Sequence, residues 1–456
     1  MDMIAPGAEA GVPVRVPLVT KPMGVWGSFQ TGRQNVLELI PEIALHQPIV
    51  SGRTVKRWHM VMDPGALRRI LKDRVEDYPK SDVTKMILRP AIGDSMFIAE
   101  GAHWHWQRRA AAPAFSPRNV QALGPVMTAA AEIAAERIGQ TEGRATNVFD
   151  EMVTTTFQVI SDVTFAGGRA FDREAVHHAI NSYIESTARV SFLDIVGAPS
   201  WIPRPSRLVT GSAMRAMKTM ADQAIEDRRG APDHGIPDLL DLLLDGEDPE
   251  TQRRMSTSEL RDNLLTFIVA GHETTALSLA WALYLCGFDP AVQDRARDEA
   301  KAALGDRAAT VADLPALPFC RRIVDEALRM YPPAAFLSRT ARAKDRLCGR
   351  DVLPGDTVML PIYALHRNHL LWPDPHRFDP DRFAGDASYD RFAYLPFGGG
   401  PRICIGASFA LQEAVIILAT LLARFRFTRV PGRDPRPVLI LTLRPEGGVW
   451  LSVERD

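Results

Sequence analysis

A glycine-rich loop around a single cysteine constrains this chain more than any other stretch. The loop reads Phe397-Gly-Gly-Gly-Pro-Arg-Ile-Cys-Ile-Gly406, with Cys404 near its end. Three glycines and a proline disfavour both helix and strand, and glycine allows the backbone amides to turn toward the sulfur. A metal deprotonates a coordinating thiol, whereas an isolated buried cysteine is usually inert. The surrounding pattern favours a thiolate ligand to a metal over inert packing.

The spacing within this loop is similar to a known signature. Phe397, Gly400, Arg402, Cys404 and Gly406 match every defined position of Phe-x-x-Gly-x-Arg-x-Cys-x-Gly, the haem-binding pattern of the cytochrome P-450 family. The resemblance implies that haem b is the cofactor and that Cys404 is the axial ligand of its iron. It also implies that Phe397, Gly400, Arg402 and Gly406 belong to the haem-binding loop.

A second unusual stretch interrupts the long apolar helix expected over 256–285. It reads Ala270-Gly-His-Glu-Thr-Thr275, where Gly271 and two threonines lower helix propensity and Glu273 sits among apolar neighbours. A helix with threonines on its polar side explains Thr275 but leaves Glu273 unexplained.

This hexapeptide resembles the distal-helix motif of the same family. The resemblance implies that Ala270 and Gly271 lie against the haem and that Thr274 binds dioxygen. Glu273 is then expected to anchor the relay that delivers protons.

A third pair, Trp104 and Arg108, is spaced i,i+4 and shares one face of a helix. A solvated amphipathic helix would also explain it. The segment resembles the Trp-x-x-x-Arg helix of the family, which implies that both residues bind a haem propionate. Arg339 is expected, on the same ground, to bind propionate as well.

Glu326 and Arg329 are spaced i,i+3 and can pair, although surface pairs of this kind contribute little. They resemble the Glu-x-x-Arg helix of the family, with Arg382 as the third member of a buried ion triad. Asp381 stands where a glutamate is usual. The expected role of this triad is to brace the Cys404 loop.

Composition excludes several other classes of protein. The 456 residues carry 54 basic and 55 acidic side chains, a balance that argues against a nucleic-acid binder. The four cysteines lie far apart, so neither a zinc site nor a disulfide framework is predicted, and a reducing cytoplasm fits best. The first 50 residues carry no apolar run long enough for a membrane span and no signal peptide.

The predicted fold is mainly α with small β-sheets, as in the cytochrome P-450 fold. No linker divides the chain, so we expect a single domain over 1–456, with a β-rich part about 1–75 and a helical body about 76–456. Strands are predicted at 55–62, hairpins at 353–361 and 438–443, and helices at 64–71, 126–138 and 152–165. By resemblance, two helices near 183–198 and 214–225 would roof the substrate pocket.

The resemblance implies an enzyme that uses O2 and two electrons to hydroxylate a lipophilic molecule. The pocket is expected near Phe97, Val269, Ala335, Phe336 and Leu441. Among lipophilic molecules, a fatty acid is the predicted substrate class, because Lys80, Lys85 or Arg89 can hold its carboxylate.

No reductase is expected within the chain, so a ferredoxin and its NAD(P)H-dependent reductase are the predicted donors. They would dock near Arg108, Arg109 and Arg118. We expect a soluble, bacterial-type monomer. A peroxide-driven peroxygenase or isomerase and a non-enzymatic haem sensor are the alternatives, and the intact Glu273-Thr274 pair weighs against the first.

Overall fold

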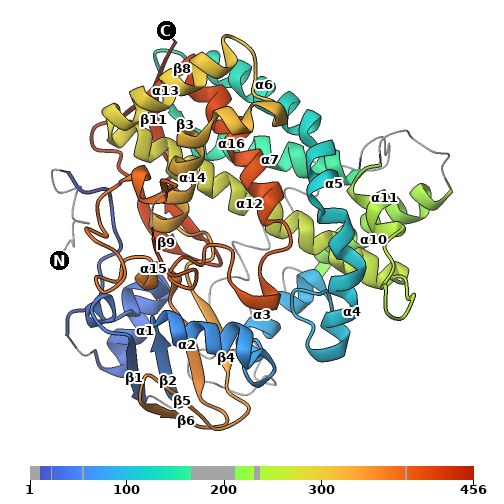
Figure 1. The fold of residues 1–456 in the computed structure, drawn as a ribbon, viewed down its shortest axis with the longest axis vertical. Coiled ribbons are helices and arrows are strands. Elements are labelled where there is room, and N and C mark those ends of the chain that lie inside the picture. The colour runs from blue at the N-terminus through green and yellow to red at the C-terminus, as the bar shows by residue number, and fades with distance from the viewer. Residues whose placement is uncertain are drawn as a thin grey trace.

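The structure of the chain is a computed structural model, and it describes residues 11–21, 23–53, 56–165, 211–230, 237–385 and 388–455. Helices occupy most of this length, and small sheets lie both at the bottom and near the top of the view in Figure 1. The fold is therefore mainly α with small β-sheets, as predicted from the sequence.

In chain order, the helices fall into two groups, which divide before the long helix that begins at Thr257. The first group is α1 (Val25–Gln34), α2 (Pro64–Arg68), α3 (Asp82–Ile92), α4 (Gly101–Ala111), α5 (Pro117–Ala122), α6 (Gly124–Gly139), α7 (Val148–Phe165), α10 (Gly211–Arg229) and α11 (Leu239–Leu244). The second is α12 (Thr257–Phe288), α13 (Pro290–Leu304), α14 (Pro318–Met330), α15 (Ile362–Leu365) and α16 (Ala407–Arg424). The predicted helices at 64–71, 126–138, 152–165, 214–225 and 256–285 are all present, although 64–71 passes into a π-helical turn after Arg68. The prediction at 183–198 lies outside the described residues.

The largest sheet joins distant parts of the chain. Its order is β1 (Ile49–Arg53), β2 (Arg57–Val61), β7 (Thr357–Leu360) and β4 (Leu337–Thr340). β2 and β7 run parallel, whereas the two outer pairs are antiparallel. The N-terminal strands are therefore half of a sheet that the C-terminal part completes.

Three smaller sheets complete the β structure of the described residues. They are β3 (Ala145–Asn147) with β11 (Trp450–Arg455) and β8 (Phe425–Arg429), β5 (Asp345–Leu347) with β6 (Arg350–Val352), and β9 (Arg436–Leu439) with β10 (Leu443–Glu446). The β9–β10 pair confirms the hairpin at 438–443. The hairpin at 353–361 was wrong, because β6 and β7 flank the Pro354-Gly355 turn but belong to different sheets.

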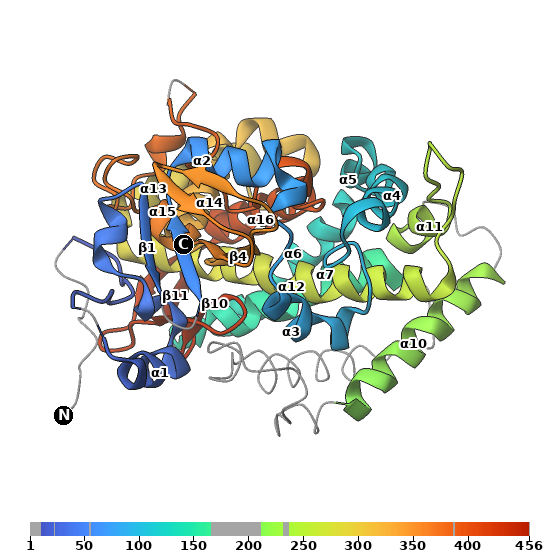
Figure 2. The same ribbon diagram turned by 90° about the horizontal axis from the view of Figure 1, so that it is seen from below.

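The long helix α12 runs through the middle of the molecule (Figure 2). Its start is fixed by a capping box in which Ser256 and Glu259 satisfy each other's backbone amides. Most of its residues are buried on every side, so packing rather than one apolar face holds it.

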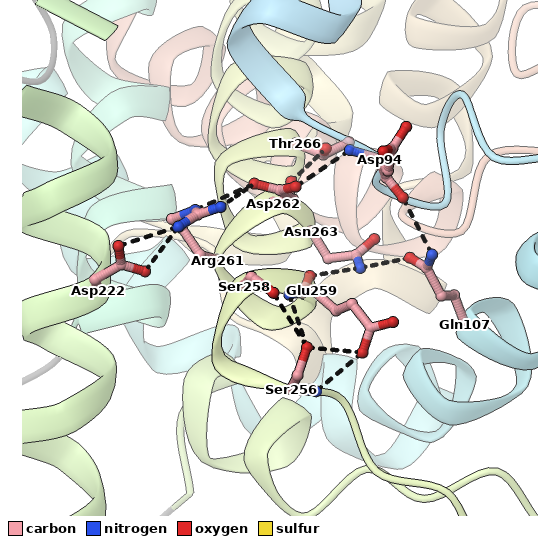
Figure 3. A network of polar contacts seen from close by, with 10 residues as sticks. All are labelled: Asp94, Gln107, Asp222, Ser256, Ser258, Glu259, Arg261, Asp262, Asn263 and Thr266. Atoms are coloured by element: carbon pink, nitrogen blue, oxygen red, sulfur yellow. Dashed lines mark hydrogen bonds and ion pairs between the residues drawn. The ribbon is translucent and has the colours of Figure 1, made fainter. Parts of the chain in front are cut away.

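The first turns of α12 are tied to three other segments (Figure 3). Arg261 pairs with Asp222 of α10 at 3.1 Å, and Asp262 accepts from the backbone amide of Asp94 at 3.1 Å. Asn263 donates to Gln107 of α4 at 2.7 Å. These contacts anchor the N-terminal turns of α12.

The helix α16 follows the cysteine loop and is long and apolar enough to cross a membrane, by length and composition alone. Inside the molecule, 72% of this helix is buried. It packs against α6, α12, α13 and α14, as a core helix does.

A buried ion pair on α14 organises the segments that precede the cysteine loop. Arg329 donates to both carboxylate oxygens of Glu326, at 2.6 and 2.7 Å, and both side chains are 0% exposed. Arg382 lies 3.4 Å from the same carboxylate. The structure thus brings together the three residues of the predicted triad.

His366 connects this ion pair to the cysteine loop. Its Nδ1 lies 3.1 Å from the carbonyl of Arg329, and its Nε2 accepts from the backbone amide of Leu395 at 2.9 Å. Burial lowers the pKa of His366 to about 3, and the charge of Arg329 adds to this shift. The ring is therefore neutral, with its proton on Nδ1.

This neutral histidine predicts a pH dependence of folding. The folded pKa lies below the unfolded value of about 6.5, so falling pH protonates the unfolded chain first and removes stability. As the pH falls from 7 to 5, protonation of His366 in the unfolded chain should lower the free energy of unfolding by about 2 kcal/mol. His366→Asn should flatten that dependence in denaturant titrations at the two pH values. His105→Asn is the surface control, and equal slopes for His366→Asn and the wild type would contradict the role of His366.

Candidate active site

Close packing shapes the loop that carries Cys404. Gly398 and Gly400 have φ angles of 72° and 68°, which favour glycine. A Cβ on Gly400 would lie 1.9 Å from the carbonyl oxygen of Leu71, so no other residue fits there. The amide of Cys404 donates to the carbonyl of Phe397 at 2.9 Å and closes the loop.

The sulfur of Cys404 lies deep among protein atoms, yet its surface is accessible, as expected of a side chain that lines an internal space. Burial raises the pKa of its thiol, whereas a hydrogen bond from the backbone of Gly406 and the charge of Arg108 lower it. The loop thus provides partial support for a thiolate, and a metal would supply the rest.

The middle of α12 has one accessible face in an otherwise buried region. Ala270 is exposed and Thr274 is half-buried, whereas His272, Glu273 and Thr275 are buried. Ala270 and Thr274 are spaced i,i+4 and share this face, and the hydroxyl of Thr274 donates to the carbonyl of Ala270 at 2.8 Å. A Cβ on Gly271 would lie 3.4 Å from Ile160 of α7, an ordinary contact distance, so packing alone does not require glycine there.

Phe115 links the cysteine loop to α12. Its ring would lie 3.9 Å from a Cβ on Gly406, and its centroid is 5.0 Å from that of Phe267. The helix α12 also packs against α16, which begins three residues after Cys404. The Cys404 loop is therefore joined to α12 both through Phe115 and through α16.

Glu273 faces away from Thr274. Its Oε1 accepts from Thr442 at 2.8 Å and from Arg444 at 2.5 Å, both on the β9–β10 hairpin. Successive residues of a helix point about 100° apart, so Glu273 and Thr274 do not share a face.

Basic side chains outnumber acidic ones around Glu100. Its carboxylate forms ion pairs with Lys85 and Arg402. It also attracts the charges of Lys80 and Arg339, which repel each other and Arg402. Burial lowers the pKa of Arg339 to about 10, with Arg402 adding to the shift. Among the described residues, the guanidinium of Arg339 donates a hydrogen bond only to the carbonyl of Ser338, at 2.9 Å.

Two further predicted residues lie close to this group of charges. The guanidinium of Arg402 sits over the ring of Trp104, with 4.4 Å to its centroid. The positive charge of Arg108 lowers the pKa of the Cys404 thiol. Arg108 has no ion-pair partner in the part of the chain that the structure describes. Such a surplus of buried positive charge fits a ligand with carboxylate groups, as haem has, because buried charges are costly unless paired.

The predicted pocket lining is only partly accessible. Phe97 is 39% exposed, and Val269, Phe336 and Leu441 are half-buried. Ala335 is 0% exposed and packs in the core, which removes it from the predicted lining.

The basic residues predicted to hold a substrate carboxylate already have partners. Lys85 pairs with Glu100 at 3.3 Å, and Arg89 pairs with Asp94 at 2.9 Å. The ammonium of Lys80 donates to the carbonyl of Phe97 and lies 3.6 Å from the centroid of its ring. None of the three is placed as a free carboxylate anchor.

Four residues of the site were missed by sequence reasoning: Glu100, His366, Thr442 and Arg444. Their partners lie far along the chain, so no spacing pattern marks them. Only Glu100 had a local signal in the sequence. It directly precedes the Trp104 helix, so its position places a carboxylate beside the predicted propionate site.

Comparisons with known proteins agree with this geometry. The family model for Cytochrome P450 matches residues 46–452. Cyclooctat-9-en-7-ol 5-monooxygenase from Streptomyces melanosporofaciens is 33% identical over 94% of this chain and 91% of its own length. Cytokinin hydroxylase from Arabidopsis thaliana is 31% identical over 80% of this chain and 72% of its own.

A solved structure agrees as well. The haem domain of cytochrome P450DA has a TM-score of 0.80 and 28% sequence identity, and the match covers 95% of this chain and 93% of that domain. The two relatives are named as a monooxygenase and a hydroxylase, and they match over 94% and 80% of this chain. The chain therefore belongs to the cytochrome P450 family of haem-thiolate monooxygenases.

Proposed function

We propose that this monooxygenase forms one integral domain that binds haem b between the Cys404 loop and the accessible face of α12. The observations that support this proposal are the accessible Cys404, the accessible face of α12 at Ala270 and Thr274, and the Phe115 ring between the loop and α12. The cofactor, when bound, supplies the oxidising centre that places one oxygen atom of O2 into a C–H bond of the substrate.

The chain's own residues hold the cofactor by charge and by packing. Cys404 would bind the iron, and Arg108, Arg339 and Trp104 would meet the two propionates. Arg402 contacts Glu100 and the ring of Trp104, so it keeps this group of charges together. The Glu326, Arg329 and Arg382 group would brace the loop through His366 and Leu395.

Thr274 and Glu273 are proposed as the groups that handle protons. The hydroxyl of Thr274 lies on the accessible face and can exchange its bond to Ala270 for a bond to a ligand. Glu273 lies one residue earlier and can pass protons inward from the hairpin side. Their presence favours O2 as oxidant over the peroxide-driven alternative.

Cys404→Ser tests the axial ligand. Without the thiolate, the reduced protein with CO should lose the absorbance at the wavelength from which the family takes its name. Cys348→Ser is the matched control, because Cys348 is exposed on the β5–β6 turn. An unchanged spectrum in Cys404→Ser would disprove the assignment.

Thr274→Ala tests proton delivery. Removing the hydroxyl should divert electrons from product to hydrogen peroxide, with roughly a tenfold lower yield of product per NADH consumed. Thr266→Ala is the control, because Thr266 makes the same bond to the carbonyl four residues earlier on the same helix, at 2.7 Å. Tight coupling in Thr274→Ala would count against its role.

The substrate is proposed to be a lipophilic small molecule. The relatives from Streptomyces are named for cyclooctatin chemistry, so a neutral cyclic terpenoid is the first candidate. A fatty acid is the second, because an open groove along α3 is lined by Lys85 and Arg89 beside Met86 and Pro90, although Asp82 lines it too. Their charges are already paired, which weakens the case for a carboxylate.

A titration separates the two substrate classes. Cyclic terpenoid alcohols should convert the haem from low spin to high spin at micromolar concentrations, and fatty acids should do so only weakly. Methyl esters of the same fatty acids are the control for carboxylate recognition. A strong shift with the acids that the esters do not produce would favour the fatty acid instead.

A ferredoxin and its NAD(P)H-dependent reductase are the proposed electron donors, and the protein is proposed to act as a cytoplasmic monomer. The proposed basic docking face is smaller than expected. Arg109 forms an ion pair with Asp248 at 2.6 Å, and the charge of Arg108 interacts with Cys404 inside the protein. Of the three arginines, only Arg118 is exposed.

A further inference from the structure

We propose that Arg444 and Thr442 are positioning residues for Glu273, so that the C-terminal hairpin, β9 to β10, controls the acid of the proton relay. This inference rests on the proposed function, in which Glu273 handles protons. It assigns a role to a hairpin whose tip residue Leu441 was expected only to line the pocket.

The contacts of Glu273 carry the inference. Its side chain is 4% exposed, and one of its oxygens, Oε1, accepts from both hairpin residues at 2.5 and 2.8 Å. Thr274 is meanwhile bonded to Ala270. The two relay groups are therefore held apart, and the partner of the acid is not on its own helix.

The hairpin is fixed firmly enough to position a side chain. The amide of Leu443 donates to the carbonyl of Pro333 at 3.0 Å, and Trp281 of α12 donates to the carbonyl of Leu443 at 3.3 Å. On the other strand, Asn35 donates to the carbonyl of Pro437 at 3.0 Å and accepts from the amide of Leu439 at 3.1 Å. Arg444 thus follows a residue that is anchored to α12 itself.

Glu273, Arg444 and Thr442 differ in whether they can exchange a proton. Arginine keeps its proton in proteins, so Arg444 can hold Glu273 as a carboxylate but cannot donate a proton to the reaction. The hydroxyl of Thr442 can both donate and accept. The side chain of Arg444 is 16% exposed, so the pair extends from the buried site toward the surface.

Removal of Arg444 should therefore disturb proton delivery rather than cofactor binding. In Arg444→Ala, the peroxide released per NADH should rise by roughly three- to tenfold, below the effect of about 100-fold that loss of a proton-transfer group can produce. The solvent deuterium isotope effect on turnover should change in the same variant. Arg444→Lys should restore most of the coupling because it restores a cation, and Thr442→Val should show a smaller effect.

Arg436→Ala is the matched control. Arg436 is on the same hairpin but pairs with Glu38 at 2.8 Å and Glu446 at 3.3 Å, so its loss removes a guanidinium without touching Glu273. Haem content should match in both variants. If Arg444→Ala and Arg436→Ala released equal peroxide from an enzyme that hydroxylates its substrate, the positioning role would be wrong while the proposed function stood.

A second measurement needs no turnover. In a double-mutant cycle of Glu273→Gln and Arg444→Ala, the effects on the denaturant midpoint should be non-additive, because the two side chains interact directly. Additive effects would overturn the link between hairpin and acid. A wild-type protein that forms no oxygenated product with any donor would instead overturn the proposed function, and the cycle would still decide whether the hairpin holds Glu273.

Discussion

The buried ion pair between Glu326 and Arg329 is the interaction on which the site depends. Both side chains are fully buried, and Arg329 also donates to the carbonyls of His366 and Pro375 at 2.8 Å. Loss of one partner from such a pair typically costs about 3–5 kcal/mol, because the other charge stays buried. The neutral ring of His366 transmits this order to Leu395, two residues before Phe397.

A second constraint is the burial of charge around the cysteine. Glu100 offers one carboxylate to a region where Lys80, Lys85, Arg339 and Arg402 converge. Burial lowers the pKa of Lys80 well below its ordinary value, with Arg339 and Arg402 adding to the shift. Burial and the neighbouring guanidinium groups thus disfavour the charge of Lys80, and a dianionic cofactor bound here would favour it.

The distal side follows a different principle. One continuous helix presents two faces, and two successive residues point to them: Thr274 lies on the accessible face and Glu273 points to the hairpin. The helix fixes the two directions, while the hairpin decides how far the acid can move. Under the proposed function, the hairpin that would contact the substrate through Leu441 also holds the acid of the proton relay.

The sequence by itself determined the motifs, because their spacings are local: the Cys404 loop, the 270–275 stretch and the helices each depend on near neighbours. It also predicted the Glu326, Arg329 and Arg382 group, by resemblance. Only the tertiary structure decided the β2–β7 pairing, the burial of Ala335, the partners of Lys85 and Arg89, and the bond of Glu273 to Arg444. Those contacts join residues from different elements, and the direction of a side chain depends on packing that no short pattern records.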